Sequence, residues 1–314
     1  MPSPERLGGG VGTSREAAAA ARSGGPIGPI LAGDQASALA RGELSETDAR
    51  ELKALKALIQ ERSGFFCDGY KEKCLRRRLA VRMRALSLHR YADYAALLER
   101  DPAEYERFLS VVTINVSKFF RNYEVWERLR AEIVPELFAL DAPEIRIWSA
   151  GCASGEEPYS VAMLLLEHAR AHHLEDRLRR MRILATDIDR GILESARRAE
   201  YPQMALDETP ATVRARWFRP VGSRYRLAEE VKRMVEFRPL DLLTEELPHG
   251  LHMALCRNVT IYFERDVQEL LFRRLGEALE PGGILVLGKV ETLFGAAARS
   301  FVPIASRERI FRRA

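Results

Sequence analysis

A glycine-containing segment in the middle of the chain has the residue types of a ligand-binding loop. It covers residues 148–160, with the sequence WSAGCASGEEPYS, and it connects a predicted strand to a predicted helix. Small residues in such a turn let a ligand approach the backbone and the helix N-terminus. Gly151 and Gly155 do not complete the GxGxxG pattern of dinucleotide-binding folds. Glu156 and Glu157 would repel a pyrophosphate but suit a cationic, phosphate-free ligand such as S-adenosylmethionine. An ordinary glycine turn explains the spacing equally well, so both interpretations stay open.

Polar side chains also follow two other predicted strands. Asp187 ends one of them, where a carboxylate can accept two hydrogen bonds from the hydroxyls of a ribose. The alternative is an N-cap for the next helix, a role that suits Asp189. Arg257 and Asn258 follow a later strand, and Tyr262 comes shortly after them. The pattern of that segment alone favours a loop with a buried tyrosine.

These segments lie within an alternation of short apolar runs and helical stretches. Strands are predicted at 145–150, 182–185, 235–237, 253–256 and 284–287, and helices at 157–170, 191–198 and 266–279. Such alternation predicts an α/β fold with a mainly parallel, doubly wound sheet, which binds ligands at the carboxyl ends of its strands. A long amphipathic helix is expected over 122–140. Prolines interrupt the alternation at about 201–233, where a strand-like run at 225–227 indicates a small inserted subdomain.

The first part of the chain has a different composition. Residues 1–44 hold nine of the 21 glycines and no aromatic side chain, so they are predicted to be a disordered tail. Residues 45–117 are predicted to form a small all-helical domain. Its first helix begins after the N-cap Ser45, a second begins near residue 70, and a third begins at Asp101-Pro102. The α/β domain is then expected over 118–314.

The overall composition is that of a soluble globular protein. The 49 Lys and Arg nearly balance the 45 Asp and Glu, which leaves a net charge of +4, and 46% of the residues are apolar. No apolar run is long enough to cross a membrane, and the N-terminus lacks the apolar core of a secretory signal. Four cysteines without a CxxC pair suit a reducing cytoplasm. His168 and His172 have the spacing of a metal pair but no suitable third ligand, so no metal site is expected.

The small net charge conceals a basic stretch. Residues 62–90 contain nine basic side chains and only two acidic ones. Four of the basic residues can lie off the apolar stripe of the second helix: Lys73, Arg76, Arg77 and Arg84. A solvated helix face is the usual explanation of such a run, and a surface for an acidic partner is the other.

Four segments, taken in their order, closely resemble the chemotaxis receptor methyltransferases, the CheR family. They are residues 113–121 (TINVSKFFR), 151–160 (GCASGEEPYS), 185–189 (ATDID) and 256–263 (CRNVTIYF). The resemblance covers about residues 45–313. It implies a helical N-terminal domain and a class I, Rossmann-like methyltransferase domain with an inserted small antiparallel β-subdomain. The implied reaction transfers a methyl group from S-adenosylmethionine to glutamate side chains of chemoreceptor cytoplasmic helices. Its products are glutamyl methyl esters and S-adenosylhomocysteine.

The resemblance also assigns residue roles. Cofactor contacts fall on Asn115, Ser117, Arg121, Gly151, Glu156 or Glu157, Asp187, Asp241, Leu242, Arg257 and Asn258. Arg121 and Tyr262 are implied to lie near the site of transfer. Ser117 replaces a threonine and keeps its hydroxyl, whereas Asp241 adds a charge where the family has an asparagine. The pair Leu251-His252 replaces Phe-Asp, which is expected to alter the entry into a strand rather than the chemistry.

The implied reaction needs no strong general base. A glutamate has a pKa of about 4.3, so its side chain is already the nucleophile at pH 7. The lack of a Ser/His/Asp or Cys/His set is consistent with this. Arg121 can orient a carboxylate, either that of the substrate or that of the cofactor, and Tyr262 can donate one hydrogen bond.

Two other functions remain to be weighed. A nucleic-acid methyltransferase would carry an Asn/Asp-Pro-Pro-Tyr/Phe motif for a flipped base, which this chain lacks. A non-catalytic module that binds cofactor and partner is the second. We therefore expect a cytoplasmic, monomeric enzyme that binds the acidic helices of methyl-accepting chemoreceptors through its basic helix and binds no nucleic acid. In some family members, the β-subdomain also binds a C-terminal receptor peptide.

Overall fold

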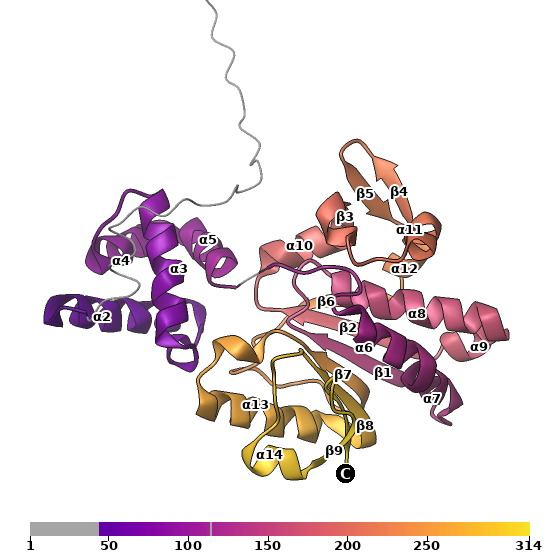
Figure 1. Cartoon of the computed structure of the whole chain (residues 1–314). Helices are drawn as coiled ribbons and strands as arrows, with labels where there is room; N and C mark the ends of the chain where they lie inside the picture. Colours follow the sequence, from indigo (N-terminus) through magenta and orange to yellow (C-terminus); the bar gives the residue numbers. More distant parts are fainter. Residues whose placement is uncertain (1–43, 114) are drawn as a thin grey trace, which may run out of the picture.

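The computed structural model describes residues 44–113 and 115–314 (Figure 1). The predicted tail, residues 1–44, lies outside the described residues except for Leu44. A group of helices forms one part of the molecule, and a seven-stranded sheet with helices on both faces forms the other. The α/β fold class, with a helical N-terminal part and a small inserted antiparallel sheet, is thereby confirmed.

Four α-helices and a short 3₁₀ turn make up the helical part. They are α2 (Glu46–Ser63), η1 (Cys67–Gly69), α3 (Glu72–Ala85), α4 (Tyr91–Arg100) and α5 (Pro102–Val112). Ser45 and Asp101 cap α2 and α5 through their side chains, as predicted. Gly64 ends α2 in the left-handed conformation, with φ of 73°, which glycine adopts without a steric penalty. The helices enclose one apolar core.

A buried ion pair joins α3 to α5. The carboxylate of Glu104 is fully buried and accepts hydrogen bonds from the Arg82 guanidinium and, at 2.9 Å, from the Tyr94 hydroxyl. Burial raises the pKa of Glu104, but these bonds outweigh it and hold the pKa below its usual range. Arg82 therefore serves the packing of the helices rather than the basic surface.

The basic helix α3 differs from its prediction at one position. Lys73, Arg77 and Arg84 are exposed. Arg76 is only 7% exposed and lies 3.7 Å from Glu72, contrary to the expectation that it would lie on the exposed face. Arg76 comes directly after Leu75 of the apolar stripe, and its side chain lies on the buried side of the helix.

The main sheet has the strand order β6-β2-β1-β7-β8-β10-β9. The strands are β1 (Ile145–Ala150), β2 (Met181–Asp187), β6 (Val235–Pro239), β7 (Leu251–Cys256), β8 (Leu279–Leu287), β9 (Phe301–Ala305) and β10 (Ile310–Arg313). The first five in this list pair in parallel, as predicted, whereas β10 is antiparallel to both β8 and β9. The sequence did not predict β9 or β10. Pro303 in β9 is tolerated because this strand lies at the edge of the sheet.

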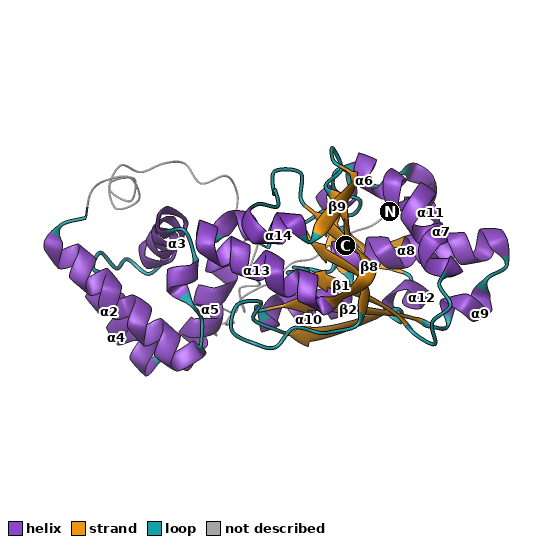
Figure 2. Ribbon diagram, turned by 90° about the horizontal axis from the view of Figure 1, so that it is seen from below, coloured by secondary structure: helices purple, strands orange, loops and turns teal. Residues whose placement is uncertain are grey.

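Helices cover both faces of the sheet (Figure 2). On one face, α8 (Glu156–His172) and α10 (Arg190–Arg198) share an apolar core with the segment from Tyr123 to Ala139. On the other face, α13 (Arg265–Ala278) and α14 (Gly295–Arg299) close a second core. Neighbouring strand residues alternate between the two cores, as in a sheet buried on both sides. The short α9 (Glu175–Leu178) follows α8.

The helix predicted over 122–140 is interrupted in its middle. It consists of α6 (Tyr123–Arg128), a π-helical turn (Leu129–Ile133) and α7 (Val134–Ala139). Pro135 has no N–H and its ring displaces the carbonyl four residues earlier, so the helix widens just before it.

The inserted subdomain lies between α10 and β6. It contains β3 (Glu200–Pro202), η3 (Gln203–Leu206), α11 (Ala211–Trp217), β4 (Phe218–Val221), β5 (Arg224–Leu227) and α12 (Glu229–Lys232). Its strands pair antiparallel in the order β3-β5-β4. Only β5 was predicted from the sequence.

A short antiparallel bridge attaches the helical part to the sheet. Tyr70 pairs with Phe263, and their rings meet edge to face at 4.9 Å. The N–H of Lys71 donates to Tyr262 O at 2.8 Å, and its ammonium donates to Ile261 O at 2.8 Å. This bridge places the start of α3 beside the segment that follows β7, which includes η4 (Thr260–Tyr262).

One buried carboxylate holds the loops at the ends of β7 and β8. Glu291, 3% exposed, accepts hydrogen bonds of 2.6–3.0 Å from four backbone N–H groups and from one hydroxyl. The N–H donors are those of Gly288, Asn258, Val259 and Thr260, and the hydroxyl is that of Thr260. A Cβ at Gly288 would lie 2.7 Å from Asn258 N, so only glycine allows this approach. The two loops are therefore fixed to each other through Glu291.

Replacing Glu291 by glutamine is expected to destabilise the fold. Both carboxylate oxygens accept N–H groups, and the amide of Glu291→Gln would point its own hydrogens at one set of donors. We expect the free energy of unfolding to fall by about 2–4 kcal/mol, measured by urea denaturation. Glu236→Gln, at an exposed ion pair, is the control and should change it by less than about 0.5 kcal/mol. Equal, small effects of the two substitutions would contradict this role of Glu291.

Candidate active site

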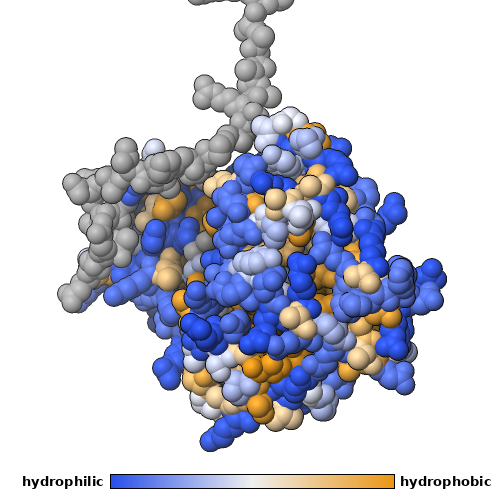
Figure 3. All heavy atoms as spheres, turned by 45° about the vertical axis from the view of Figure 1, so that its right-hand side comes forward, coloured by the Kyte–Doolittle hydropathy of each residue, from blue (hydrophilic) through white to orange (hydrophobic). Residues whose placement is uncertain are grey.

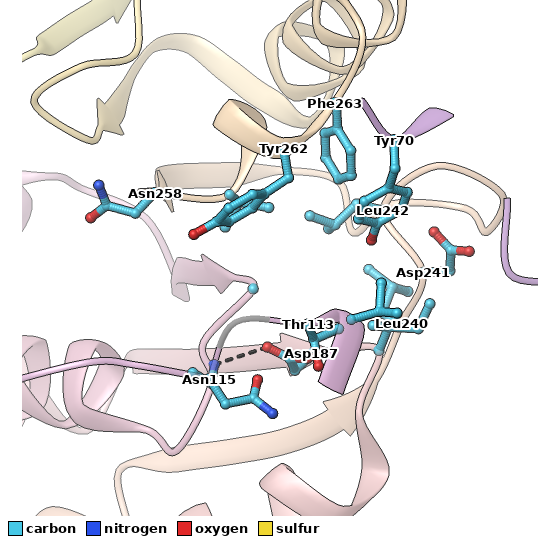
Figure 4. Close-up of a pocket in the computed structure, with 15 residues that line it drawn as sticks. Tyr70, Thr113, Asn115, Asp187, Leu240, Asp241, Leu242, Asn258, Tyr262 and Phe263 are labelled. Atoms are coloured by element: carbon cyan, nitrogen blue, oxygen red, sulfur yellow. Dashed lines mark hydrogen bonds between the residues drawn. The ribbon is translucent and has the colours of Figure 1, made fainter. Parts of the chain in front are cut away.

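A pocket opens at the carboxyl ends of β1, β2, β6 and β7, where the helical part meets the sheet. Its empty space, including the part open to solvent, is about 640 Å³. Its lining includes residues of both parts of the molecule: Tyr70, Val112, Thr113, Asn115, Gly151, Ala153, Asp187, Ile188, Leu240, Asp241, Leu242, Asn258, Val259, Tyr262 and Phe263. Figure 4 shows Tyr262 and Tyr70 above the cavity and Asp187 and Asn115 below it. We call it the main pocket.

A smaller pocket of about 420 Å³ adjoins the main pocket, and we call it the side pocket. Both are lined by Gly151, Ala153 and Asn258, so they meet at the glycine loop. The other lining residues of the side pocket are Val116, Ser117, Lys118, Arg121, Cys152, Glu157 and Arg257. Except for Glu156, every cofactor residue implied by the family resemblance therefore lines one of two connected pockets.

The glycine loop is held against the end of β2. The N–H groups of Gly151 and Cys152 donate to Thr186 O, and the N–H of Ala153 donates to the Asp187 carboxylate at 2.9 Å. Gly151 has φ of 71°, and a Cβ there would lie 2.5 Å from Val259. Glycine is thus required at 151 for both the turn and the close approach of the loop after β7.

Asp187 and Asp189 are placed differently, and the N-cap expected at Asp189 is confirmed. Asp189 is the N-cap of α10, because its side chain accepts the N–H of Ile192 at 3.1 Å, and it also accepts the Asn115 amide at 2.8 Å. Asp187 lines the main pocket and is 7% exposed. Burial raises the pKa of Asp187 to about 6, although hydrogen bonds from three backbone N–H groups oppose the rise.

The two glutamates of the loop point in different directions. Glu157 faces the side pocket, where it accepts the Ser149 hydroxyl at 2.8 Å and pairs with Arg257 at 3.4 Å. Burial raises its pKa, and Arg257 opposes the rise. Glu156 instead accepts the Ser154 hydroxyl and lines a groove beside the subdomain, which shares Val116, Ser117 and Lys118 with the side pocket. Burial raises the pKa of Glu156 to about 7. Of the two residues left open by the resemblance, Glu157 is the one that lines the pockets.

Two arginines line the side pocket in different ways. Arg257 is 7% exposed, lies 5.5 Å from the Trp126 ring, and donates to Arg121 O at 2.8 Å. Its Nε is buried and has no partner among the described residues. Arg121 is less buried, and its guanidinium contacts only Val116 O, at 3.4 Å, among the described residues. Arg121 thus leaves N–H donors for an anionic group in this pocket, whereas the terminal nitrogens of Arg257 are committed to protein partners.

Tyr262 and Asp241 line opposite sides of the main pocket (Figure 4). Burial raises the pKa of Tyr262, and the nearby cations Arg78 and Arg121 oppose the rise. Its hydroxyl therefore stays protonated at neutral pH and can donate a hydrogen bond. Asp241 is 9% exposed and accepts the N–H of Leu243 at 2.8 Å.

Two residues of this region were not predicted from the sequence. Tyr70 reaches the main pocket from the helical part, and nothing in its local pattern distinguishes it from a core tyrosine. Glu291, which holds the loop of Asn258, follows the end of β8 by a few residues, and an acid at that place is a usable signal. The basic residues of α3 that were assigned to substrate binding line neither pocket.

Three further observations concern metal binding, membrane spanning and the polarity of the surface. Within residues 44–113 and 115–314, no group of three or more His, Cys, Asp and Glu side chains could hold a metal ion. No helix in this part of the chain is long and apolar enough to span a bilayer. The face shown in Figure 3 is mainly hydrophilic, with small dispersed apolar patches.

The polar and apolar side chains that line the two pockets fit S-adenosylmethionine. Asp187 can accept ribose hydroxyls, and the apolar side chains of Leu242 and Ile188 suit an adenine. In the side pocket, Glu157 suits an ammonium group, and the guanidinium of Arg121 suits a carboxylate. A dinucleotide would place its phosphates against these acidic groups.

Comparisons with known proteins lead to the same cofactor. Residues 115–310 match the family described as "CheR methyltransferase, SAM binding domain", and residues 50–113 match "CheR methyltransferase, all-alpha domain". The "Chemotaxis protein methyltransferase" of Listeria monocytogenes is 32% identical over 73% of this chain and 84% of its own length. That of Escherichia coli is 32% identical over 79% and 86%. "Chemotaxis protein methyltransferase 2" of Pseudomonas aeruginosa is 34% identical over 70% and 78%. The chain therefore belongs to the CheR methyltransferase family, and its cofactor is S-adenosylmethionine.

Proposed function

We propose that this chain methylates glutamate side chains of chemoreceptor cytoplasmic helices, with S-adenosylmethionine as the methyl donor. The observation that carries the proposal is the junction of the two pockets. There, acidic groups suited to a cationic cofactor lie next to Arg121 and Tyr262, two donors suited to an anionic acceptor. The named relatives, all chemotaxis methyltransferases, support a receptor as the protein substrate.

The side chains of this site have simple tasks in such a reaction. The bound cofactor supplies an electrophilic methyl group on a sulfonium. The glutamate of the substrate is ionised at neutral pH, so the site needs no general base. Tyr262 can donate a hydrogen bond to the acceptor carboxylate, and Arg121 can orient a carboxylate at the boundary with the side pocket. Tyr70 and Phe263, joined by the antiparallel bridge, form one wall of the main pocket.

Three groups on α3 extend the proposed substrate surface beyond the pockets. Lys73, Arg77 and Arg84 are exposed, and α3 begins directly after Lys71, which bonds to the backbone around Tyr262. A receptor helix with several acidic residues would therefore meet positive charge next to the transfer site. The buried Arg76 is excluded from this surface.

Transfer of labelled methyl from S-adenosylmethionine to a receptor cytoplasmic fragment tests the proposal. We expect label on the fragment that is released by base, as a glutamyl ester would be. Label on RNA or DNA would favour a nucleic-acid methyltransferase, and tight cofactor binding without any transfer would favour a non-catalytic module. Receptor fragments with and without their C-terminal tails should be compared, because the subdomain is a candidate for binding such a tail.

The affinity for S-adenosylhomocysteine is expected to depend on Asp187. Loss of the charged acceptor in Asp187→Asn should weaken binding about 10- to 100-fold, measured by calorimetry. In the free enzyme the Asp187 carboxyl has a pKa of about 6, and the ionised form is the better acceptor. Affinity should be constant above that pH and fall about tenfold per pH unit below it.

The control for Asp187→Asn is Asp176→Asn at an exposed position. Most of the pH dependence should disappear in Asp187→Asn, while Glu157, whose pKa is also raised, accounts for the remainder. An unchanged pH profile in Asp187→Asn would remove Asp187 from cofactor binding.

The basic surface is expected to act in a salt-dependent way. Arg77→Glu combined with Lys73→Glu should raise KM for the receptor fragment roughly tenfold at low salt and leave the affinity for S-adenosylhomocysteine unchanged. The difference should shrink near 0.5 M salt, because ions screen exposed charges. Arg100→Glu, at an exposed position of α4, is the control. Wild-type KM in the double variant at low salt would argue against α3 as the receptor surface.

A further inference from the structure

Arg121 lies in an unusual turn of the backbone. Its two neighbours, Phe120 and Asn122, both have positive φ, of 54° and 59°. Residues with a Cβ seldom adopt this left-handed conformation, and they keep it only where surrounding contacts determine it. The direction of the Arg121 side chain therefore depends on what holds this turn.

Contacts within the part of the molecule that contains the seven-stranded sheet hold one side of the turn. Arg121 O accepts the Trp126 indole N–H at 3.0 Å and the Arg257 guanidinium at 2.8 Å. The N–H of Phe120 donates to the Ser160 hydroxyl at 3.1 Å. These bonds fix the carbonyl of Arg121 and the N–H of Phe120. The N–H of Asn122, at the other end of the same peptide unit as the Arg121 carbonyl, bonds to a different partner.

The inserted subdomain supplies that partner. The N–H of Asn122 donates to the carboxylate of Glu208 at 2.7 Å, and the N–H of Phe119 donates to Ala205 O at 2.9 Å. The Phe119 ring packs edge to face on Tyr201 at 4.7 Å, and it meets a second subdomain ring, Phe218, at 4.9 Å. A single segment of the subdomain thus fixes the backbone on both sides of Arg121.

We propose that Glu208 is a positioning residue for Arg121, so that the inserted subdomain forms part of the catalytic site. The inference rests on the proposed function, since it needs Arg121 to contact substrate or cofactor. A hydrogen bond from an N–H to a carboxylate is stronger than one between neutral groups, and Glu208 is the acceptor for the N–H of Asn122. Without Glu208 the turn can relax toward an unstrained conformation, and the guanidinium then leaves its place at the side pocket.

The neighbouring Asp207 provides a matched control. Both acids lie near the ammonium of Lys118, Asp207 at 3.5 Å and Glu208 at 3.9 Å. Both are about equally exposed at their side chains, 49% and 36%. Only Glu208 bonds to the backbone of the turn. An effect of charge alone would therefore appear in variants of both residues, whereas positioning would appear only at Glu208.

The first experiment compares Glu208→Ala, Asp207→Ala and Glu208→Gln. We expect Glu208→Ala to lower kcat on the receptor fragment about 10- to 100-fold, with an unfolding temperature close to that of the wild type. Asp207→Ala should stay within about twofold of the wild type. Glu208→Gln keeps an acceptor oxygen and should recover most of the activity. Equal losses in both alanine variants, or no recovery with glutamine, would overturn the proposal.

A second measurement does not depend on the substrate. Amide hydrogen exchange at residues 119–123 should accelerate in Glu208→Ala and remain at the wild-type rate in Asp207→Ala. Unchanged exchange in Glu208→Ala would show that Glu208 does not hold the turn. If the wild type fails to methylate the receptor fragment, the proposed function fails, and the exchange data still decide whether Glu208 holds the turn.

The link to Arg121 is tested by a double-mutant cycle. In an Arg121→Lys background, Glu208→Ala should reduce kcat by less than about threefold, because the group it positions has already been altered. A full, additive loss in that background would mean that Glu208 acts on another part of the site.

Discussion

The active site depends on the burial of one carboxylate between two loops. Glu291 gathers N–H groups from the ends of β7 and β8, and those loops carry Asn258 and lead to Tyr262. Unpaired N–H groups at the carboxyl edge of a sheet would be costly to bury, and a single ionised side chain satisfies four of them. Because of this arrangement, the side chain of Val259 after β7 lies directly against Gly151, at the boundary between the two pockets.

The pockets are completed by parts of the chain that are remote in sequence. Tyr70 enters from the helical part, Arg121 from the connection before α6, and Asp187 and Asp241 from the ends of strands. Tyr70 packs against the core of the helical part and against the second core of the sheet. The helical part is thus a wall of the cofactor pocket as well as the carrier of the basic helix. The +4 net charge conceals this division between a basic helix and an acidic cofactor loop.

Four of the eight described non-glycine residues with positive φ lie at these pockets or next to a residue that lines them. Phe120, Asn122, Ala153 and Asn258 all have positive φ although none is glycine. Such conformations are maintained by hydrogen bonds from elsewhere: Glu208 for Asn122, Asp187 for Ala153, and Glu291 for Asn258. In each case a carboxylate accepts the N–H of the left-handed residue. The acidic side chains of this protein therefore shape the site in addition to any contact with the cofactor.

The sequence by itself determined the alternating strands and helices, the ligand edge of the sheet, and the family. Periodicity and strand-end residues are local signals, so β1, β2, β7, the N-cap Asp189 and the pocket residue Asp187 could be predicted from them. The tertiary structure shows that Glu157 lines the side pocket and that Glu156 lines a neighbouring groove, because neighbouring residues at the start of a helix point in directions that depend on packing. It also decided that Arg76 is buried and that Tyr70, Glu208 and Glu291 support the site. Their roles arise from contacts between segments far apart in the chain, and no local pattern encodes such contacts.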